Sequence, residues 1–346
     1  MTKQKSTTIH DIADALGINS STVSRALNDH PKVSEKTKKK VREMATQLNY
    51  RPNVLASNLR TSRSGTIGVI VPFISRYFFS TVIAGIEEEA HKAGYNVLIS
   101  QSKDRLELEK KNIKTMMDSR VEGILISPAL EGTDGQHIQE ALDHGVPVFF
   151  FDRYHEGIET TKVLMNDRST AKALGQHLLQ EGGTHFLLLT GQMDSSIYRD
   201  RAAGIKDALE STGRDWATQV TSQKIPLTVE GGIEAVENSL KKGEVFDVVY
   251  AMNDLAAIGA VQALLKAGKK IPEDYMVVGF SNEPTSELIH PSITTVNQSA
   301  WTMGKTVTRK LVEQLKDKEL SVASETTILK SELVIRTSSS KRNLER

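Results

Sequence analysis

Residues 8–28 read TIHDIADALGINSSTVSRALN, and their pattern predicts two short helices joined by a tight turn. Apolar residues recur with the spacing of one helix face at Ile9, Ile12, Ala13 and Leu16. Thr8 suits the N-cap position of the first helix, and Gly17 suits the left-handed conformation that ends it. The stretch therefore predicts a compact helical pair near the N-terminus.

The second predicted helix has a narrow apolar stripe and a broad polar face. Asn19 or Ser20 can cap it, and its apolar positions are Val23, Ala26 and Leu27. The opposite face carries short hydrogen-bonding side chains and one cation, namely Ser21, Thr22, Ser24, Arg25 and Asn28. Such a face can contact base edges and phosphates in the major groove of DNA. The alternative is a small helical hairpin with a solvated face.

A third helix is expected from Ser34, and it completes a three-helix core through Val41, Met44, Ala45 and Leu48. Basic residues crowd this helix at Lys36, Lys38, Lys39, Lys40 and Arg42. A lysine run is by itself only a solvated face. However, residues 1–64 contain 12 Lys+Arg and 5 Asp+Glu, a charge of +7, whereas the other 282 residues carry a charge of −6. A basic head on an acidic body indicates that the head binds the phosphate backbone.

Residues 50–64, YRPNVLASNLRTSRS, connect the head to the rest of the chain. Pro52 ends the third helix, and Asn53 can cap a further short helix with Leu55, Ala56 and Leu59 on its apolar face. A helix of about 8 residues is not stable alone in water. We expect it to fold when two copies pair on DNA, with Leu59 inserted between base steps of the minor groove. The alternative is a flexible tether.

The body has a different pattern, in which short apolar strands alternate with amphipathic helices. The first series contains TIGVIVP, a helix over 79–93, YNVLIS, EGILIS and PVFFFD. The second series starts near Lys162 and contains KVLMND, HFLLLTG, a helix from about Tyr198, a strand near Val220, DVVYAMN and MVVGFS. Such alternation predicts two doubly wound, parallel-sheet subdomains of the α/β class. We expect SITTVNQ, a helix over about 299–317 and ILKSELVIRTS to cross back and complete the first subdomain.

Composition and missing motifs exclude several classes of protein. The chain has no cysteine, so we expect neither disulfides nor thiolate metal sites. No apolar run approaches the roughly 18 residues that span a membrane, and MTKQKSTT is not a signal peptide. The metalloprotease, phosphate-loop, nucleophile-elbow and dinucleotide motifs are absent. We therefore expect a cytoplasmic, nucleoid-associated protein without a catalytic site, metal or cofactor.

Candidate ligand-binding residues follow the predicted strands, where doubly wound folds bind ligands. A polyol needs charged or amide partners for its hydroxyls and a flat apolar surface for its ring. Side chains of both kinds stand at these positions: Phe78, Phe79, Asp152, Arg153, Arg201, Asn253, Asp254, Ser281 and Asn282. Structural roles are the alternatives, namely a core position for the phenylalanines, an internal ion pair for Arg201, a subdomain hinge for Asp152 and a helix N-cap for Asp254.

The motif T-x-x-D-I-A-x-x-L-G-I-N-S-S-T-V-S-R-A-L-N, with V-S-E-K-T and L-N-Y-R-P-N-x-x-A-x-x-L after it, resembles the lactose-repressor (LacI/GalR) family of bacterial transcription regulators. The resemblance extends from residue 8 to about residue 337. It implies a helix-turn-helix head and a body like a periplasmic sugar-binding protein. It also implies that the recognition helix contacts DNA through Ser20, Ser21, Thr22, Ser24, Arg25 and Asn28. Phosphate contacts are implied for Thr8, Thr37, Tyr50 and Asn53, and hinge-helix contacts for Ala56 and Leu59.

The resemblance also implies an effector cleft between the two subdomains. The positions that match its lining are Phe78, Phe79, Asp152, Arg201, Asn253, Ser281 and Asn282. Many relatives have two acids where this chain has Ser281 and Asn282, and some stack an aromatic ring on the ligand where it has Leu227. The effector of a relative therefore does not transfer directly to this chain.

These expectations combine into a dimeric repressor that binds palindromic operator DNA under the control of a small molecule. The effector is expected to be a sugar or sugar derivative, with a nucleobase as the second class. The expected divisions are a DNA-binding domain at 1–52, a hinge and linker at 53–64, a core at 65–337 and a polar tail at 338–346. Within the core, subdomain one covers about 65–162 and 296–337, and subdomain two about 163–295. An intracellular sugar-binding module and an enzyme of similar fold are the alternatives.

Overall fold

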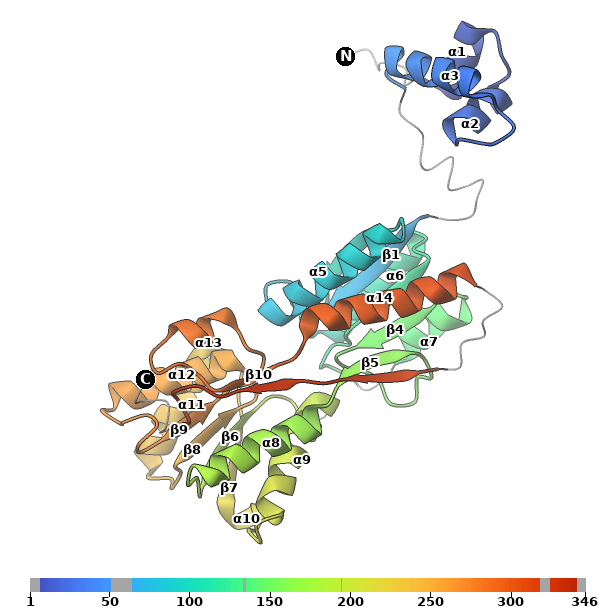
Figure 1. The fold of residues 1–346 in the computed structure, drawn as a ribbon. Coiled ribbons are helices and arrows are strands. Elements are labelled where there is room, and N and C mark those ends of the chain that lie inside the picture. The colour runs from blue at the N-terminus through green and yellow to red at the C-terminus, as the bar shows by residue number, and fades with distance from the viewer. Residues whose placement is uncertain (1–6, 51–63, 133–134, 194, 318–323, 341–346) are drawn as a thin grey trace. The chain divides into compact units, whose positions relative to one another are not determined.

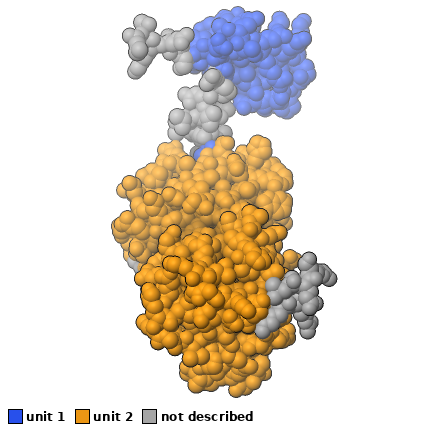
Figure 2. All heavy atoms as spheres, turned by 90° about the vertical axis from the view of Figure 1, so that its left-hand side faces the viewer, with its two compact units in different colours: residues 1–64 blue, residues 65–346 orange. Residues whose placement is uncertain are grey.

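The computed structural model describes residues 7–50, 64–132, 135–193, 195–317 and 324–340. The chain divides into two compact units, residues 1–64 and residues 65–346, which are coloured separately in Figure 2. We describe each unit by itself.

The first unit is a three-helix head made of α1 (Ile9–Leu16), α2 (Ser20–Leu27) and α3 (Glu35–Gln47). Local signals start and stop these helices as the sequence predicts. Thr8 and Asp11 form a reciprocal capping box, Gly17 has a left-handed φ of 64°, and the Ser34 side chain accepts a hydrogen bond from the Thr37 amide. The core consists of fully buried side chains from all three helices, Ile12, Val23, Ala26 and Val41. The predicted head is therefore confirmed.

The second unit begins with a six-stranded parallel sheet, in the order β11-β5-β4-β3-β1-β2 (Figure 1). Its strands are β1 (Thr66–Val71), β2 (Asn96–Gln101), β3 (Gly123–Ile126), β4 (Val148–Phe151), β5 (Lys162–Met165) and β11 (Thr326–Leu329). One face packs against α5 (Tyr77–Lys92) and α14 (Ala300–Lys316), and the other against α6 (Leu106–Asp118) and α7 (Gln136–Asp143). Gly85 and Gly304 let α5 and α14 approach closely, since a Cβ at Gly85 would lie 2.3 Å from the Trp301 carbonyl oxygen. We call this part subdomain 1.

Subdomain 2 contains a four-stranded parallel sheet in the order β7-β6-β8-β9. Its strands are β6 (Phe186–Thr190), β7 (Val220–Lys224), β8 (Val248–Ala251) and β9 (Met276–Val278). Helices α8 (Asp167–Gln180) and α9 (Ser196–Glu210) cover one face, and α11 (Val229–Lys242) and α12 (Asp254–Lys266) cover the other. The short helices are α10 (Trp216–Gln219) and α13 (Pro284–Leu288). The expected class, a helical head and an α/β body of two doubly wound subdomains, is confirmed.

The two subdomains are joined where the chain passes between them. β10 (Thr295–Asn297) and β12 (Glu332–Val334) pair antiparallel as a small separate sheet. The Asn166 amide donates to the Leu329 carbonyl, and the Asn166 side chain accepts from the Ser331 amide. Segments from three parts of the chain therefore meet at the junction.

Two details of the expected organisation are wrong. KVLMND does not open the second series, because β5 pairs with β4 and β11 in the sheet of subdomain 1. The last section of the chain completes subdomain 1 only through α14 and β11. Beyond β12 the chain returns to subdomain 2, where the Ser338 amide donates to the Ser292 carbonyl and the Val277 amide donates to the Ser338 carbonyl.

Residues 338–340 are consequently not part of a solvated tail, contrary to the expectation for 338–346. Ser338 and Ser339 are fully buried, and Ser340 is nearly so. Ser338 Oγ donates to the Val277 carbonyl, and Ser339 Oγ lies 2.8 Å from His177 Nε2. Buried hydroxyls fit here because each has a hydrogen-bond partner, which the sequence pattern alone does not show.

We expect deletion of residues 338–346 to destabilise the body. The deletion leaves the Val277 amide and carbonyl, and the His177 ring, without the partners they have here, and an unsatisfied buried polar group costs about 1–3 kcal/mol. A thermal melt should show a fall of several degrees in Tm. Truncation after Ser340 is the control, because it removes none of these contacts. Equal Tm values for the two truncations would contradict this role of the serines.

Candidate functional site

The predicted DNA-contacting residues share the outer face of α2. Val23 and Ala26 point into the head core and are fully buried. The remaining face is formed by exposed Ser21, Arg25 and Asn28 and by half-buried Ser20, Thr22 and Ser24. Asn28 has a second role, since its side-chain amide donates to the Ser24 carbonyl at the end of the helix. The structure thus brings the six positions together on one surface.

Two of the predicted phosphate-contacting residues lie at helix N-termini. Thr8 is the N-cap of α1, and Thr37 lies in the first turn of α3, where its hydroxyl is 2.9 Å from that of Ser34. Helix N-termini attract anions because their backbone N–H groups point outward. Tyr50 is half-buried and packs against the head core. The remaining predicted contacts, Asn53, Ala56 and Leu59, lie outside the described residues.

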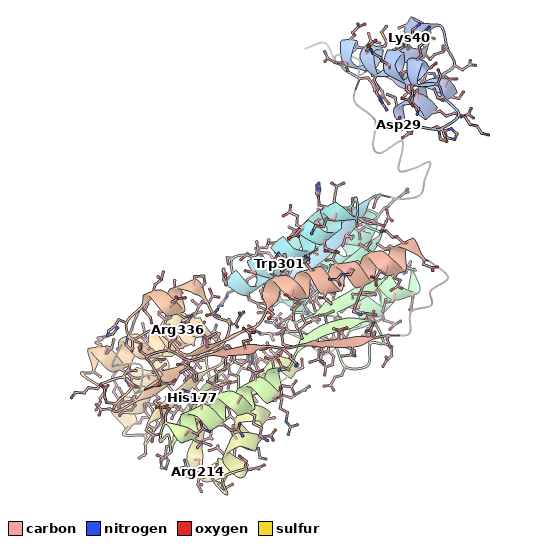
Figure 3. The ribbon with its side chains drawn as sticks, in the orientation of Figure 1. Asp29, Lys40, His177, Arg214, Trp301 and Arg336 are labelled. Atoms are coloured by element: carbon pink, nitrogen blue, oxygen red, sulfur yellow. The ribbon has the colours of Figure 1, made fainter. Side chains whose placement is uncertain are left out.

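The basic residues of α3 are not equivalent, which the sequence did not indicate. Lys38 is buried and bonds both Asp29 and Glu35, and Arg42 lies 2.6 Å from the Asp29 carboxylate (Figure 3 labels Asp29). These two cations attach α3 to the loop after α2. Lys36, Lys39 and Lys40 remain exposed. These three lysines are therefore the basic side chains of α3 whose exposure leaves them accessible to a phosphate backbone.

A cavity of about 100 Å³ in the body brings together residues that follow strands of both sheets. We call it the central cavity. Six of the seven predicted effector residues line its wall, namely Phe78, Phe79, Asp152, Arg201, Asn253 and Ser281. The wall also includes ten residues that were not predicted as effector residues: Phe73, Arg76, Asp104, Arg153, Ile197, Tyr198, Leu227, Met252, Glu283 and Gln298. Sequence alone offered a signal for Asp104 and Gln298, because each follows a strand that the pattern predicts.

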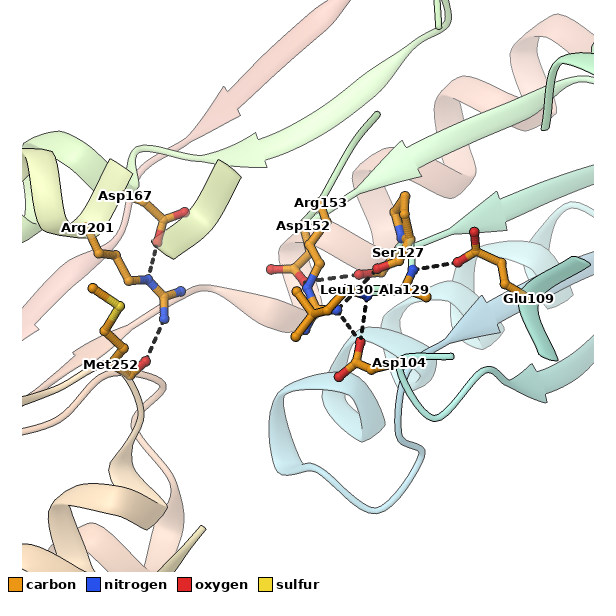
Figure 4. Close-up of polar contacts among 11 residues, drawn as sticks. Asp104, Glu109, Ser127, Ala129, Leu130, Asp152, Arg153, Asp167, Arg201 and Met252 are labelled. Atoms are coloured by element: carbon orange, nitrogen blue, oxygen red, sulfur yellow. Dashed lines mark hydrogen bonds and ion pairs between the residues drawn. The ribbon is translucent and has the colours of Figure 1, made fainter. Parts of the chain in front are cut away.

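Arg201 is held rigidly in the wall of the central cavity (Figure 4). Its Nε donates to Asp167 and its Nη1 donates to the Met252 carbonyl, both at 2.8 Å. The guanidinium also lies over the Phe280 ring, 3.7 Å from its centroid. Arg201 therefore forms an internal ion pair and also faces the cavity, so the two roles considered for it do not exclude each other.

Asp152 and Arg153 directly follow β4 and lie in the same wall. Asp152 has a left-handed φ of 64°, a strained conformation for a residue with a Cβ. Its carboxylate accepts a hydrogen bond from Ser127, and Arg153 Nη1 donates to Asp104 at 2.5 Å (Figure 4). Burial raises the pKa of Asp152 to about 6 against the opposing charge of Arg153. The hydrogen bond from Ser127 and the Arg153 guanidinium, whose Nε lies 3.7 Å from the carboxylate, hold the Asp152 side chain at the cavity.

Three further predicted residues lie on the loops that follow β8 and β9. Asn253 is the N-cap of α12: its side chain accepts from the Ala256 amide and donates to the Leu227 carbonyl. Asp254 is therefore not the cap, contrary to the alternative considered for it. It is fully buried and accepts hydrogen bonds from Thr295 Oγ1 and the Glu283 amide. Ser281 lines the central cavity, with a φ of 127°.

Asn282 is the predicted residue that the structure does not place in the wall of the central cavity. Its side-chain oxygen accepts a hydrogen bond from Arg336, which is labelled in Figure 3 and also bonds Ser286 and the Ile293 carbonyl. The C-terminal segment thereby holds the turn that carries Ser281. Asn282 therefore stabilises the turn beside Ser281 through Arg336 and does not itself line the cavity.

The raised pKa of Asp152 makes a testable contribution to stability. An unfolded aspartate titrates near its usual value of 3.8, so the folded chain holds this proton more tightly. The free energy of unfolding therefore falls as the pH rises from about 4 to about 6, by about 2–3 kcal/mol for a shift of this size. We expect Asp152→Asn to lose this dependence, so that its stability relative to wild type increases across the window. Urea titrations of both proteins over this pH range measure the difference in their free energies of unfolding. The same pH dependence in wild type and Asp152→Asn would contradict the prediction.

The head and the body together define a class of protein: a DNA-binding unit attached to a ligand-binding unit of doubly wound subdomains. Two family models match the chain. Residues 8–53 match "Bacterial regulatory proteins, lacI family", and residues 64–335 match "Periplasmic binding proteins and sugar binding domain of LacI family". The chain belongs to the LacI family.

Relatives and solved structures agree with this assignment. The transcriptional regulator RegA of Clostridium saccharobutylicum is 30% identical over 96% of this chain and 99% of its own. The lac repressor dimer bound to operator and the anti-inducer ONPF has a TM-score of 0.86 and is 26% identical, covering 97% of this chain and 99% of its own. A LacI-family regulator from Enterococcus faecium with bound ribose has a TM-score of 0.71 and is 26% identical, covering 80% and 98%.

The protein is thus a DNA-binding transcriptional regulator with a helix-turn-helix head, and a small-molecule effector bound to its body controls its affinity for DNA. Its relatives are transcription regulators. Within the described residues, no helix has both the length and the apolar character needed to cross a membrane.

Proposed function

We propose that this protein is a homodimeric repressor of a palindromic operator, and that a neutral, monosaccharide-sized polyol in the central cavity sets its affinity for DNA. The observation that carries the proposal is the composition of that cavity, which combines paired charges with aromatic rings. The proposal assigns no catalytic residue, metal or cofactor to the chain. The protein acts on DNA in the nucleoid.

The central cavity offers what a polyol requires. Arg201 and Asn253 carry N–H donors, and Asp152 carries carboxylate acceptors for hydroxyl groups. Phe78 and Phe79 pack edge to face with centroids 5.1 Å apart, and both line the cavity as well as the core. Sugar rings present apolar faces that pack on such aromatic surfaces. The ribose bound to the Enterococcus faecium regulator supports this ligand class.

A neutral ligand is favoured because the two guanidinium groups buried in the wall already have carboxylate partners. Arg201 pairs with Asp167, and Arg153 pairs with Asp104. An anionic ligand would have to displace one of these carboxylates, and leaving a buried charge unpaired is costly. The volume of about 100 Å³ favours one ring over two. A nucleobase remains the second class, and the position of Leu227 offers it no aromatic ring.

We infer that the effector controls DNA binding by changing the contact between the two subdomains at the central cavity. Arg76, after β1 in subdomain 1, donates a hydrogen bond to the carbonyl of Leu227, after β7 in subdomain 2. A ligand lodged between the two loops changes which separation of the subdomains is most stable. DNA affinity then follows by linkage, provided that the ligand binds the two arrangements differently. A coupling of about 1–3 kcal/mol is typical.

The dimer connects this change to the operator. Two copies of α2 are proposed to enter successive major grooves about one helical turn apart on a symmetric site. The segment 53–64 is proposed to fold as a paired hinge helix on the operator, with Ala56 and Leu59 in the minor groove. The operator-bound lac repressor dimer supports this arrangement.

The ligand class is tested most directly on protein taken from cells. Native mass spectrometry should reveal a co-purified small molecule, and thermal-shift screening should then rank sugars, sugar acids and nucleobases. We expect a neutral monosaccharide to raise the Tm and to change the retention of operator DNA. A response to nucleobases alone would overturn the assignment of a sugar. Chemical conversion of the bound sugar during incubation would instead indicate an enzyme.

A further inference from the structure

Arg76 connects the two subdomains in the wall of the central cavity. It lies between β1 and α5 in subdomain 1, and its Nη1 donates a hydrogen bond of 3.3 Å to the Leu227 carbonyl in subdomain 2. Its guanidinium also lies 5.7 Å from the centroid of the Phe73 ring, which belongs to subdomain 1. All three residues line the cavity. One side chain therefore spans the boundary between the two subdomains.

Subdomain 2 fixes the groups that face Arg76 through its own contacts. The Leu227 carbonyl also accepts a hydrogen bond of 2.9 Å from the Asn253 side chain. Glu283 lines the same cavity, and its backbone amide donates to Asp254 Oδ2 at 2.7 Å. Subdomain 2 therefore presents a carbonyl oxygen in a fixed position and an acidic residue on a fixed backbone.

The start of α5 has no local group to balance its positive charge. Arg76 is the N-cap of this helix but makes no side-chain capping hydrogen bond, and the first turn contains no acidic residue. An arginine side chain has no acceptor oxygen of the kind that serine, threonine or aspartate offers at an N-cap. The N-terminus of a helix carries a partial positive charge, to which Arg76 adds a full one. A negative group from another part of the chain is therefore favoured here.

Glu283 of subdomain 2 supplies this negative group. Burial raises the pKa of its carboxyl group, and the nearby charge of Asp254 raises it further. Two groups of subdomain 1 act in the opposite direction, namely the positive charge of Arg76 and the backbone amide of Tyr77 in the first turn of α5. The Glu283 carboxylate therefore faces the N-terminus of α5 across the subdomain boundary.

We propose that Arg76 is a latch, which holds the subdomains through the Leu227 carbonyl and the Glu283 carboxylate in the arrangement where both contribute to the wall of the central cavity. This inference rests on the proposed function, because an effector contacts both subdomains only in that arrangement. Arg76 is thus a positioning residue. Its loss weakens effector binding by reducing the fraction of chains that are ready to bind, whether or not the side chain touches the effector.

A second contact crosses the same boundary more weakly. Arg199 of α9 pairs with Glu156, which lies in the segment after β4 in subdomain 1. The two side chains are 47% and 69% exposed, and exposed ion pairs contribute little. We therefore expect the arrangement of the subdomains to depend more on Arg76 than on Arg199.

Distances measured by electron paramagnetic resonance in the full-length, ligand-free protein test the latch. The chain has no cysteine, so Lys111→Cys in α6 and Asn238→Cys in α11 place one exposed spin label on each subdomain (Figure 1). Labelled chains are diluted with unlabelled ones by subunit exchange, so that only distances within one chain are measured. We expect one dominant distance in the labelled parent. Arg76→Gln should raise the population of other distances relative to it at least about threefold, because a hydrogen bond from a charged group is lost.

Arg105→Gln is the matched control for Arg76→Gln. Arg105 is also an arginine N-cap without a side-chain capping hydrogen bond, on α6, and it does not line the central cavity. Glu283→Gln should shift the distances in the same direction as Arg76→Gln, and Arg199→Gln should shift them less. Identical distance distributions for the parent and Arg76→Gln, or equal changes in Arg76→Gln and Arg105→Gln, would overturn the latch.

Operator retention and its response to neutral monosaccharides, measured on the same variants, separate the latch from the proposed function. If the parent retains operator and responds to a monosaccharide while Arg76→Gln leaves the distances unchanged, the latch alone has failed. If Arg76→Gln changes the distances but no monosaccharide changes operator retention, the latch stands and the proposed ligand class has failed.

Discussion

Arg201→Ala should abolish the response to effector while leaving operator binding intact in one state of the protein. The variant removes a donor group from the central cavity together with the cation–π contact to Phe280. It also leaves Asp167 buried without its partner, which typically costs about 3–5 kcal/mol. We therefore expect a lower Tm as well as a loss of ligand-induced change in DNA affinity. Fluorescence anisotropy of labelled operator, with and without ligand, measures the response.

The contribution to folding can be separated from the contribution to binding. Arg201→Ala combined with Asp167→Asn removes the uncompensated charge, so part of the lost stability should return. The effector response should remain absent, because the donor is still missing from the cavity. Arg168→Ala is the control, since it breaks the exposed pair between α8 and α9 and Arg168 does not line the central cavity. A fully responsive Arg201→Ala protein would remove this residue from the binding site.

Arg25→Ala should produce the largest loss of sequence discrimination in the head. Arg25 is exposed in the last turn of α2, opposite the buried Val23 and Ala26, so the substitution leaves the core unchanged. A bidentate arginine contact with guanine contributes about 1–3 kcal/mol of discrimination. We therefore expect operator affinity to fall roughly tenfold or more, while affinity for unrelated duplex changes much less.

Lys39→Ala provides the contrast for Arg25→Ala. Lys39 is exposed on α3 and is assigned to phosphate. Its loss should weaken binding to operator and to unrelated DNA alike, and should reduce the steepness of the salt dependence by about one unit. Competition assays with both kinds of duplex distinguish the two variants. An Arg25→Ala protein with unchanged preference for its operator would contradict the assignment of α2 to base recognition.

The parts of the fold that could be predicted from sequence are those with local causes. The capping box of Thr8 and Asp11, the left-handed Gly17 and the N-cap Ser34 each involve neighbours in sequence, and the structure has all three. The alternation of apolar strands and amphipathic helices likewise placed the doubly wound body. Such signals define elements well but say little about which elements pair.

The errors in strand pairing, in the C-terminal segment and at Lys38 involve partners outside the local sequence pattern. β5 belongs to subdomain 1 because it pairs with β4 and with β11, a strand that follows it by more than 160 residues. Ser338 and Ser339 are buried because Val277 and His177 offer hydrogen bonds, although a run of serines resembles a tail. Lys38 differs from neighbouring lysines because Asp29 comes close to it. None of these partners is visible in a local pattern.

The residues of the central cavity likewise divide into those that the sequence predicts and those that depend on the tertiary structure. Six of its residues were predicted from strand ends and from the family motif. Arg76 and Tyr198 were missed as lining residues, because their presence depends on how the two subdomains face each other. Asp254 was assigned to the wrong structural role for a smaller reason: the cap shifted by one residue to Asn253.

The central claim is that a ligand in the body controls a cationic head that binds DNA. The direct measurement is the affinity of the full-length protein for genomic duplexes that it selects, titrated against salt with and without the co-purified ligand. We predict a loss on the order of a thousandfold between about 50 and about 200 mM salt, together with a shift of about fivefold or more on adding ligand. Retention of no duplex at low ionic strength under any ligand condition would contradict the account.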